Sequence, residues 1–502
     1  MRFLCLAILL WLTSPLAAQK SRSLFDQLPP ADSNIKIVLP SQAGYANASQ
    51  PFNVRYDFQP AGIAFPTTIE EISDLVKLAV RTNNHVVARG GGHSYISNGL
   101  GGRNGSLVID LSNFKQIIVD DATGNAAIQM GNRLGEIITT LNAHGRGMGH
   151  GTCPYVGIGG HATHGGFGFT SRMWGLALDA ILSIDLVLAN GTITTASETQ
   201  NSDLFWAMRG AGSSFGIATS ITVRTFPIPT SATIYSYNWQ LNESQAVTAL
   251  SAYQSFALTA DLPADLGPAM VLRRGAALGN VSVTLSGGFY RADPNNTQLL
   301  ATLAPILSVM PPPRTQSFDT GTYLNSADHL AGESLNTTAQ PDATDTFYVK
   351  SLMTPQKVPM TDEAISAMMQ VIVNEGFTTP VTAWFFDIDL YGGRNSAVNS
   401  VKSDDTAFVH RDSLFTFQFY ASSPGKVPPY PEAGFQYLDD VVNALTGTMP
   451  PDWDYGAYTN YVDDRLIDWQ RRYYGANYAR LQKLKDLYDP RGTFMFPTAI
   501  EN

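Results

Sequence analysis

The sequence predicts an α+β protein of two domains. The 502-residue chain is 44% hydrophobic and 15% charged, so it has enough apolar material for one large core or two. Residues 55–228 alternate between short strand-like runs and helical patterns, with frequent glycine turns. From about Thr230 to Asp454 glycine becomes rarer and proline more frequent, and this change of composition indicates a separate second domain.

The first domain contains one helix with a clear start and three strand-like runs. Thr68 is followed three residues later by Glu71, which is the capping-box pattern for a helix over residues 68–82. Short apolar runs bounded by polar residues and glycine predict strands at residues 85–89, 106–110 and 126–129.

The second domain and the C-terminal segment differ in their patterns. Apolar and polar residues alternate over residues 281–290 and 382–390, and this alternation predicts strands. Residues 469–487 return to a helical pattern that is rich in tyrosine, arginine and leucine and ends before Asp489 and Pro490.

The first eighteen residues have the order of a secretory signal peptide. Arg2 precedes an apolar run over residues 4–12, and the small residues Ala17 and Ala18 mark a cleavage site, so the mature chain is expected to begin near Gln19. A buried first helix is the alternative. A secreted glycoprotein is also indicated by seven Asn-X-Ser/Thr sequons, which begin at Asn47, Asn104, Asn190, Asn242, Asn280, Asn295 and Asn336.

Charge and cysteine content exclude several classes of protein. The net charge of −10 and the lack of a Lys/Arg cluster argue against a nucleic-acid partner. No segment after the signal reaches the roughly 18 apolar residues of a membrane span. Of the two cysteines, Cys5 leaves with the signal, so Cys153 has no disulfide partner and is either inert or committed to another bond.

Glycine is concentrated in two segments. The first follows a predicted strand and reads Arg89-Gly90-Gly91-Gly92-His93-Ser94-Tyr95. Successive backbone N–H groups in such a loop can hold a pyrophosphate, although a tight turn gives the same pattern. His93 would then lie beside whatever the loop binds.

The second glycine-rich segment, residues 149–166, surrounds Cys153. Glycine gives a core strand nothing to pack, so close approach of the backbone to a large planar or phosphorylated ligand explains the run better. His150, His161, His164 and Cys153 are an alternative set of metal ligands. The carboxylate or second cysteine of a usual site is missing nearby, and we predict no metal site.

With these motifs the chain resembles the berberine-bridge-enzyme-like branch of the vanillyl-alcohol-oxidase flavoproteins, particularly secreted fungal oligosaccharide oxidases. Three motifs carry the resemblance: the Arg-Gly-Gly-Gly-His-Ser loop, the run from Cys153 to His161, and Tyr473-Tyr474-Gly475-Ala476-Asn477-Tyr478-Ala479-Arg480-Leu481 with Tyr488-Asp489-Pro490. The resemblance implies a two-domain vanillyl-alcohol-oxidase-type fold whose substrate domain is an antiparallel sheet flanked by helices. The implied parts are a signal peptide (1–18), an FAD-binding domain (19–228, core 56–228), a substrate-binding domain (229–454) and a C-terminal segment that returns to the FAD-binding domain (455–502).

The resemblance also implies FAD attached through two covalent bonds. The flavin 8α carbon would be joined to His93 and the ring C6 to Cys153, which would explain the unpaired cysteine. Two covalent bonds keep the flavin in an open groove and tune its oxidising power. Further FAD contacts are expected from Gly90, Gly91, Gly92, Ser94, Gly157, Gly159, Gly160, His161, Gly165, Gly166, Gly216, Ile217 and Asn477.

For catalysis the resemblance places a tyrosine base at Tyr461 and an assisting carboxylate at Asp389. A tyrosine with a pKa of about 10 is a poor base near neutrality unless a neighbour accepts its proton. Asp387, two residues away on the same strand face, could be mistaken for the assisting residue. Ordinary packing is the alternative for Tyr461, and a strand-end turn is the alternative for Asp389.

The resemblance places the substrate groove at Tyr95, Trp384, Asp387 and Gln418, because aromatic faces suit sugar rings and amides bond hydroxyl groups. Phe385 and Asp387 stand where a tryptophan and a glutamine are expected, which leaves the sugar open. Val156 is small enough to admit O2 to the flavin, although it could simply pack beneath the ring.

We therefore expect a secreted, monomeric FAD-dependent oxidase. It would oxidise the reducing-end C1 hydroxyl of an oligosaccharide to the lactone, and then the aldonic acid, while O2 is reduced to H2O2. Two alternatives stay open: an alkaloid or polyketide oxidase of the same fold, and a carbohydrate-binding protein that has lost catalysis.

Overall fold

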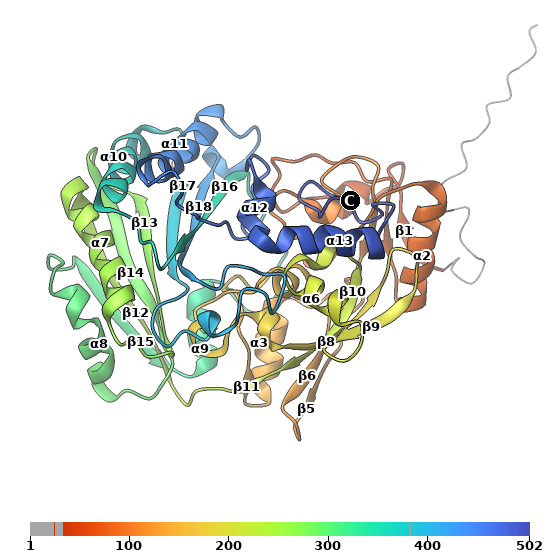
Figure 1. Cartoon of the computed structure of the whole chain (residues 1–502), viewed down its shortest axis with the longest axis horizontal. Helices are drawn as coiled ribbons and strands as arrows, with labels where there is room; N and C mark the ends of the chain where they lie inside the picture. Colours follow the sequence, from red (N-terminus) through yellow and green to blue (C-terminus); the bar gives the residue numbers. More distant parts are fainter. Residues whose placement is uncertain (1–24, 26–33, 382) are drawn as a thin grey trace, which may run out of the picture.

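The computed structural model describes residues 25, 34–381 and 383–502, and it consists of two halves that lie side by side (Figure 1). The predicted signal peptide and Cys5 lie outside the described residues. Each half has its own large hydrophobic core. None of the helices in the described ranges is long and apolar enough to cross a membrane.

The first half contains two main sheets. In the mixed sheet the strand order is β1 (Lys36–Val38), β2 (Gly62–Phe65), β4 (Leu107–Asp110) and β3 (Val86–Arg89), with the last three parallel. In the antiparallel sheet the order is β5 (Ile117–Asp120), β6 (Asn125–Gln129), β10 (Ile217–Arg224), β8 (Ile181–Val187) and β9 (Ile193–Ser197). A short pair is formed by β7 (Arg146–Gly147) and β11 (Phe226–Pro227).

The helices of the first half are α1 (Tyr45–Ala48), α2 (Ile69–Thr82), α3 (Leu134–Ala143), α4 (Ile158–Thr163), α5 (Ser171–Trp174) and α6 (Ser202–Ala211). The predicted start of α2 is confirmed. The Thr68 hydroxyl accepts from Glu71 N at 3.2 Å, and the Glu71 carboxylate accepts from Thr68 N at 3.3 Å. These two bonds satisfy amide groups that the first turn would otherwise leave unpaired.

The second half is built on one seven-stranded antiparallel sheet. Its strand order is β15 (Thr315–Gly321), β12 (Ala232–Asn242), β14 (Asn280–Phe289), β13 (Leu266–Arg274), β17 (Ala383–Leu390), β18 (Ser413–Ser422) and β16 (Phe347–Pro355). One face packs against α7 (Glu243–Thr259), α8 (Thr297–Leu307), α10 (Asp362–Thr378) and α11 (Glu432–Thr448), while α9 (Tyr323–Ala331) lies near β15 (Figure 1). The strands expected at 281–290 and 382–390 are β14 and β17.

The C-terminal segment lies against the first half. Its helices α12 (Trp469–Tyr474) and α13 (Tyr478–Tyr488) contribute Tyr473 and Leu481 to the first core. The single helical stretch expected over 469–487 is wrong in one respect, because Gly475 adopts a φ of 50° that interrupts the helix. The observed architecture confirms the α+β class, and the domain boundaries after residues 228 and 454 stay predictions.

Candidate functional site

A cavity of about 1110 Å³ lies between the two halves. This volume exceeds the range of about 300–1000 Å³ that suits a drug-sized ligand. Most of the predicted site residues line it: Gly90, Gly91, Gly92, His93, Ser94, Tyr95, Cys153, Val156, Gly157, Gly159, Gly160, His161, Gly216, Ile217, Trp384, Asp387, Gln418 and Tyr461. The cavity therefore has a wall from the first half and a wall from the second.

The wall from the first half presents unpaired backbone donors. Within the described chain, the N–H groups of residues 90–95 donate to no carbonyl or side chain. Gly91 and Gly157 pack so closely that a Cβ on either would overlap the backbone nitrogen of the other. Two glycine loops in close contact, with a row of free donors facing a cavity, form a cradle for an anionic ligand.

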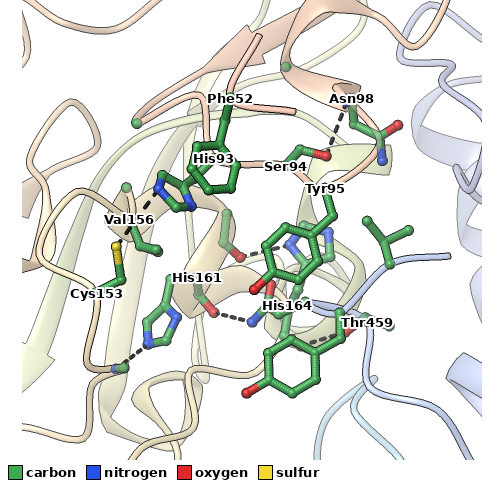
Figure 2. Close-up of a pocket in the computed structure, with 18 of the residues that line it drawn as sticks. Phe52, His93, Ser94, Tyr95, Asn98, Cys153, Val156, His161, His164 and Thr459 are labelled. Carbon is green, nitrogen blue, oxygen red and sulfur yellow. Dashed lines mark hydrogen bonds between the residues drawn. The ribbon is translucent and has the colours of Figure 1, made fainter. Parts of the chain in front are cut away.

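His93 lies at the end of this cradle, between an aromatic ring and two acidic groups. The Phe52 ring stacks on the imidazole at 3.7 Å between centroids, and Cys153 Sγ is 3.8 Å from Nε2 (Figure 2). Asp342 Oδ2 lies 3.2 Å from the same nitrogen. Burial alone would lower the pKa of His93, but Asp342 and Cys153 outweigh it and raise the pKa to about 9.

The thiol and the histidine come from two loops that are far apart in the sequence. Cys153 is the only cysteine among the described residues, and it is a free thiol. Val156 follows it and lines the cavity near His93 (Figure 2). The structure therefore brings together the two residues that were expected to hold one ligand.

Two further histidines of this wall are uncharged. Burial lowers the pKa of His161 to about 3, with a smaller effect from His150, and burial lowers the pKa of His164 to about 4. His161 Nε2 accepts from Gly151 N at 3.1 Å, which places the ring proton on Nδ1. The wall thus offers neutral imidazole groups.

The wall from the second half is one face of the central strands. Asp387 on β17 pairs directly with Gln418 on β18, and Phe385 stacks on Tyr420 at 4.8 Å. Gln418 Nε2 donates to the Tyr95 hydroxyl at 2.7 Å. This bond joins the sheet to the glycine loop of the other wall.

Tyr461 lies between the two walls. Its ring is parallel to that of Tyr95, with 6.1 Å between centroids, and meets the Tyr458 ring edge-on at 4.9 Å. Among the described residues, burial and nearby charges act on its hydroxyl, and no hydrogen bond does. Burial raises the pKa of Tyr461 well above its usual value, and negative charge on Asp389 raises it further.

Asp389 and Asp387 form an acidic pair beside Tyr461. Asp387 lines the cavity, whereas Asp389 is buried behind the lining. Burial raises the pKa of Asp387 to about 6, against the opposing charge of Arg273. Burial and the charge of Asp387 raise the pKa of Asp389 well above its usual value. Each carboxyl of the pair therefore holds its proton to a higher pH than an exposed aspartate does.

The indole of Trp384 belongs to the core, which corrects the prediction of a sugar-facing ring. Its Nε1 donates to Gly376 O at 2.8 Å, and the ring stacks on Phe386 at 4.7 Å. Side chains alternate across a strand, so Phe385, Asp387 and Asp389 face the site and Trp384 faces the helices. Phe385 is the aromatic residue of this wall.

Three predicted FAD contacts lie outside the cavity lining. Gly166 N donates to the Tyr458 hydroxyl at 2.9 Å, and a Cβ on Gly165 would press on the Tyr458 ring. Asn477 Nδ2 donates to the carbonyls of residues 403, 406 and 407. These residues approach other parts of the protein closely, so their glycine and amide character is explained without a ligand.

Sequence reasoning missed several residues of the site. Asn460 Nδ2 donates to His161 O and to the Tyr458 hydroxyl, so it supports the tyrosine motif. It lay next to the predicted base and could have been found there. Phe52 and Asp342 carry no such signal, because only the fold brings residues 52 and 342 to His93.

The residues present fit a flavin dinucleotide. The unpaired N–H row suits a pyrophosphate, and the cavity continues from it past the histidine and the thiol. In the ranges that the structure describes, no group of three His, Cys, Asp or Glu side chains is arranged to hold a metal ion. These features define the site of a cofactor-dependent oxidoreductase.

Comparison with known proteins identifies the family to which the chain is similar. Residues 60–197 match the family described as FAD binding domain, and residues 457–501 match the family described as Berberine and berberine like. The xylooligosaccharide oxidase of Thermothelomyces thermophilus is 39% identical over 463 residues, which cover 90% of this chain and 89% of that protein.

Two solved structures are similar over almost their whole length. The xylooligosaccharide oxidase from Myceliophthora thermophila C1 in complex with xylobiose has a TM-score of 0.87 at 35% identity and covers 95% of this chain and 99% of that one. The glucooligosaccharide oxidase from Acremonium strictum, described with 6-S-cysteinyl, 8α-N1-histidyl FAD, has a TM-score of 0.86 at 33% identity with the same coverage. The chain belongs to the berberine-bridge-enzyme-like family of the vanillyl-alcohol-oxidase flavoproteins, and it is an FAD-dependent oxidoreductase with the fold that the resemblance implied.

Proposed function

We propose that this chain is a secreted oxidase that converts the reducing-end C1 hydroxyl of an oligosaccharide to a lactone and passes the electrons to O2, giving H2O2. The observation that carries the proposal is the cavity itself. One wall has the glycine cradle with His93 and Cys153, and the facing wall has the Asp387 carboxyl, with Asp389 buried behind it, an amide and an aromatic ring. Xylo-, gluco- and chito-oligosaccharide oxidases among the relatives support the substrate class.

On the cofactor side, we propose that FAD is attached to His93 at the 8α carbon and to Cys153 at C6. The support is the short distance of 3.8 Å between the two side chains and the covalent links described for the glucooligosaccharide oxidase. The residues of the glycine loops would hold the rest of the group, namely Gly90, Gly91, Gly92, Ser94, Gly157, Gly159, Gly160, His161, Gly216 and Ile217. FAD supplies the acceptor for the hydride that leaves C1.

On the substrate side, Tyr461 is the proposed base. A buried tyrosine with a raised pKa keeps its proton, so it can take the C1 hydroxyl proton only if its own proton moves on. The Asp387–Asp389 pair is the proposed acceptor for that proton, because a carboxylate with a raised pKa is a stronger base than an ordinary one. Tyr95, Phe385 and Gln418 would then position the sugar.

Val156 is proposed to leave space for O2. It is a small side chain on the cavity lining, three residues after Cys153. An oxidase needs O2 to reach the flavin, and a bulkier residue here would restrict it. We further propose that the enzyme is monomeric and leaves the cell after removal of residues 1–18.

The direct test is peroxide release from a panel of cello-, xylo-, malto- and chito-oligosaccharides. At least one series is expected to give peroxide together with one equivalent of aldonic acid. Peroxide from none of them, with flavin present in the protein, would contradict the sugar assignment and favour an alkaloid or polyketide as substrate. Absence of flavin would contradict the cofactor assignment as well.

A further inference from the structure

Asp342 is placed to act on His93. Its carboxylate Oδ2 lies 3.2 Å from His93 Nε2, closer than the 3.8 Å to Cys153 Sγ. The Asp342 side chain is only 24% exposed and the His93 side chain only 9%. Asp342 comes from the segment between α9 and β16, whereas His93 belongs to the glycine loop that follows β3.

The segment that carries Asp342 is fixed on both sides of it. Before Asp342, the Tyr155 hydroxyl donates to Gln340 O at 3.0 Å. After it, Asp345 N donates to Phe52 O at 3.1 Å, next to the ring that stacks on His93. The imidazole is therefore held by a ring on its face and by a carboxylate at Nε2, both from segments that are bonded to each other.

A carboxylate at Nε2 determines which ring nitrogen is free to react. A neutral imidazole has one N–H and one lone pair, and the N–H turns to the stronger acceptor. With the proton on Nε2 facing Asp342, Nδ1 keeps the lone pair. With the pKa of His93 raised to about 9, the ring carries both protons most of the time near neutrality, so the neutral form is the minor one and Asp342 determines which nitrogen keeps its proton in that form.

We propose that Asp342 is the positioning residue for flavin attachment: it holds the Nε2–H tautomer of His93 and accepts that proton when Nδ1 becomes bonded to the flavin. The inference rests on the proposed bond between His93 and FAD. In the balanced reaction, the Nδ1–C8α bond replaces one C–H bond of the 8α methyl group. The methyl hydrogen and the Nε2 proton leave with one electron pair, which O2 takes up as H2O2.

The test uses full-length protein in which Cys153→Ala removes the second attachment point. In this background, flavin that stays with acid-precipitated protein reports the His93 bond alone. Time courses of acid-stable flavin are compared among C153A, C153A/D342N and C153A/E333Q, with total bound flavin measured separately. Glu333 is the matched control, since it lines the same cavity and lies within electrostatic range of His93 without contacting it.

The expected result is that D342N slows attachment by about 100-fold, the lower end of the contribution of a positioned proton acceptor, while total bound flavin stays the same. E333Q is expected to attach flavin at the rate of C153A. C153A/D342E, followed in the same time course, should attach flavin faster than C153A/D342N, because it keeps a carboxylate. A purely structural role would not predict this partial recovery. Equal rates for C153A and C153A/D342N would overturn the proposal. A C153A protein with bound but fully acid-extractable flavin would refute the His93 bond itself, and the proposal with it.

Discussion

The two walls of the cavity use different parts of the polypeptide. On the cofactor wall the backbone supplies most of the contacts, through unpaired N–H groups and glycines that touch each other, and two reactive side chains complete it. On the substrate wall the backbone is fully used in a sheet, and alternate side chains of β17 and β18 face the cavity. Where the backbone makes the contacts, most side-chain substitutions leave the binding of the ligand unaltered, which suits a cofactor. Where alternate strand side chains make the contacts, a single substitution alters the groups that face the ligand, which suits a substrate site.

Among substitutions on the substrate wall, that of Tyr461 should have the largest effect on the rate of flavin reduction. Tyr461→Phe removes the proposed base and is expected to slow flavin reduction by sugar about 1000-fold. Flavin content should stay that of the parent, because the cofactor wall is untouched. Anaerobic stopped-flow reduction measures the effect. Unchanged reduction would mean that another group is the base, and Tyr458 would be the next residue to test.

Neighbouring positions on β17 should give opposite results. Trp384→Ala is expected to destabilise the protein by about 3–5 kcal/mol, since it leaves a hole in the core. Phe385→Ala should leave the melting temperature almost unchanged and raise the KM for sugar about tenfold, equivalent to about 1.4 kcal/mol. Thermal unfolding and steady-state kinetics on both variants separate these effects. A raised KM with normal stability for Trp384→Ala would contradict the strand orientation.

The cofactor wall offers a matched pair of glycines. Gly157→Ala would press a methyl group on the backbone of Gly91 and should destabilise the protein by about 1–3 kcal/mol. A Cβ on Gly160 would have no atom within 4 Å, so Gly160→Ala should fold normally. Because Gly160 lines the cavity, this variant should instead lower flavin incorporation. Unfolding curves and flavin-to-protein ratios distinguish the two, and equal stability losses would count against the close loop contact.

The acidic pair should make stability depend on pH. The folded-state pKa of Asp387 is about 6, above its usual 3.8, so the stability that protonation contributes is present below pH 4 and is lost as pH rises through 6. Asp387→Asn removes this loss. Relative to the parent, the free energy of unfolding of the variant should therefore be about 2 kcal/mol higher at pH 8 than it is at pH 4. Melting temperatures across this range measure the gain, with exposed Asp452→Asn as control; parallel curves for Asp387→Asn and the parent would refute the buried titration.

The sequence anticipated the cofactor wall better than the substrate wall. His93, Cys153 and the glycine loops are contiguous motifs, and the loops' local geometry depends on residues close in the chain. The prediction that Trp384 faces the sugar was wrong. The strand sequence shows that side chains alternate, but only the packing of the sheet against the helices determines which alternate set is buried. Phe52 and Asp342 could not be found, since both reach His93 only through long-range contacts. The break at Gly475 was also missed, because a helical pattern continues on both sides of it.

The central claim is that sugar reduces a flavin held in this cavity and that O2 takes the electrons. The most direct measurement follows the visible spectrum of the purified protein when an oligosaccharide is added without oxygen and air is admitted afterwards. We predict that the yellow absorbance bleaches with the sugar and returns with air, with peroxide formed as the colour returns. A flavin spectrum that no oligosaccharide changes, or one that stays bleached in air, would contradict the account.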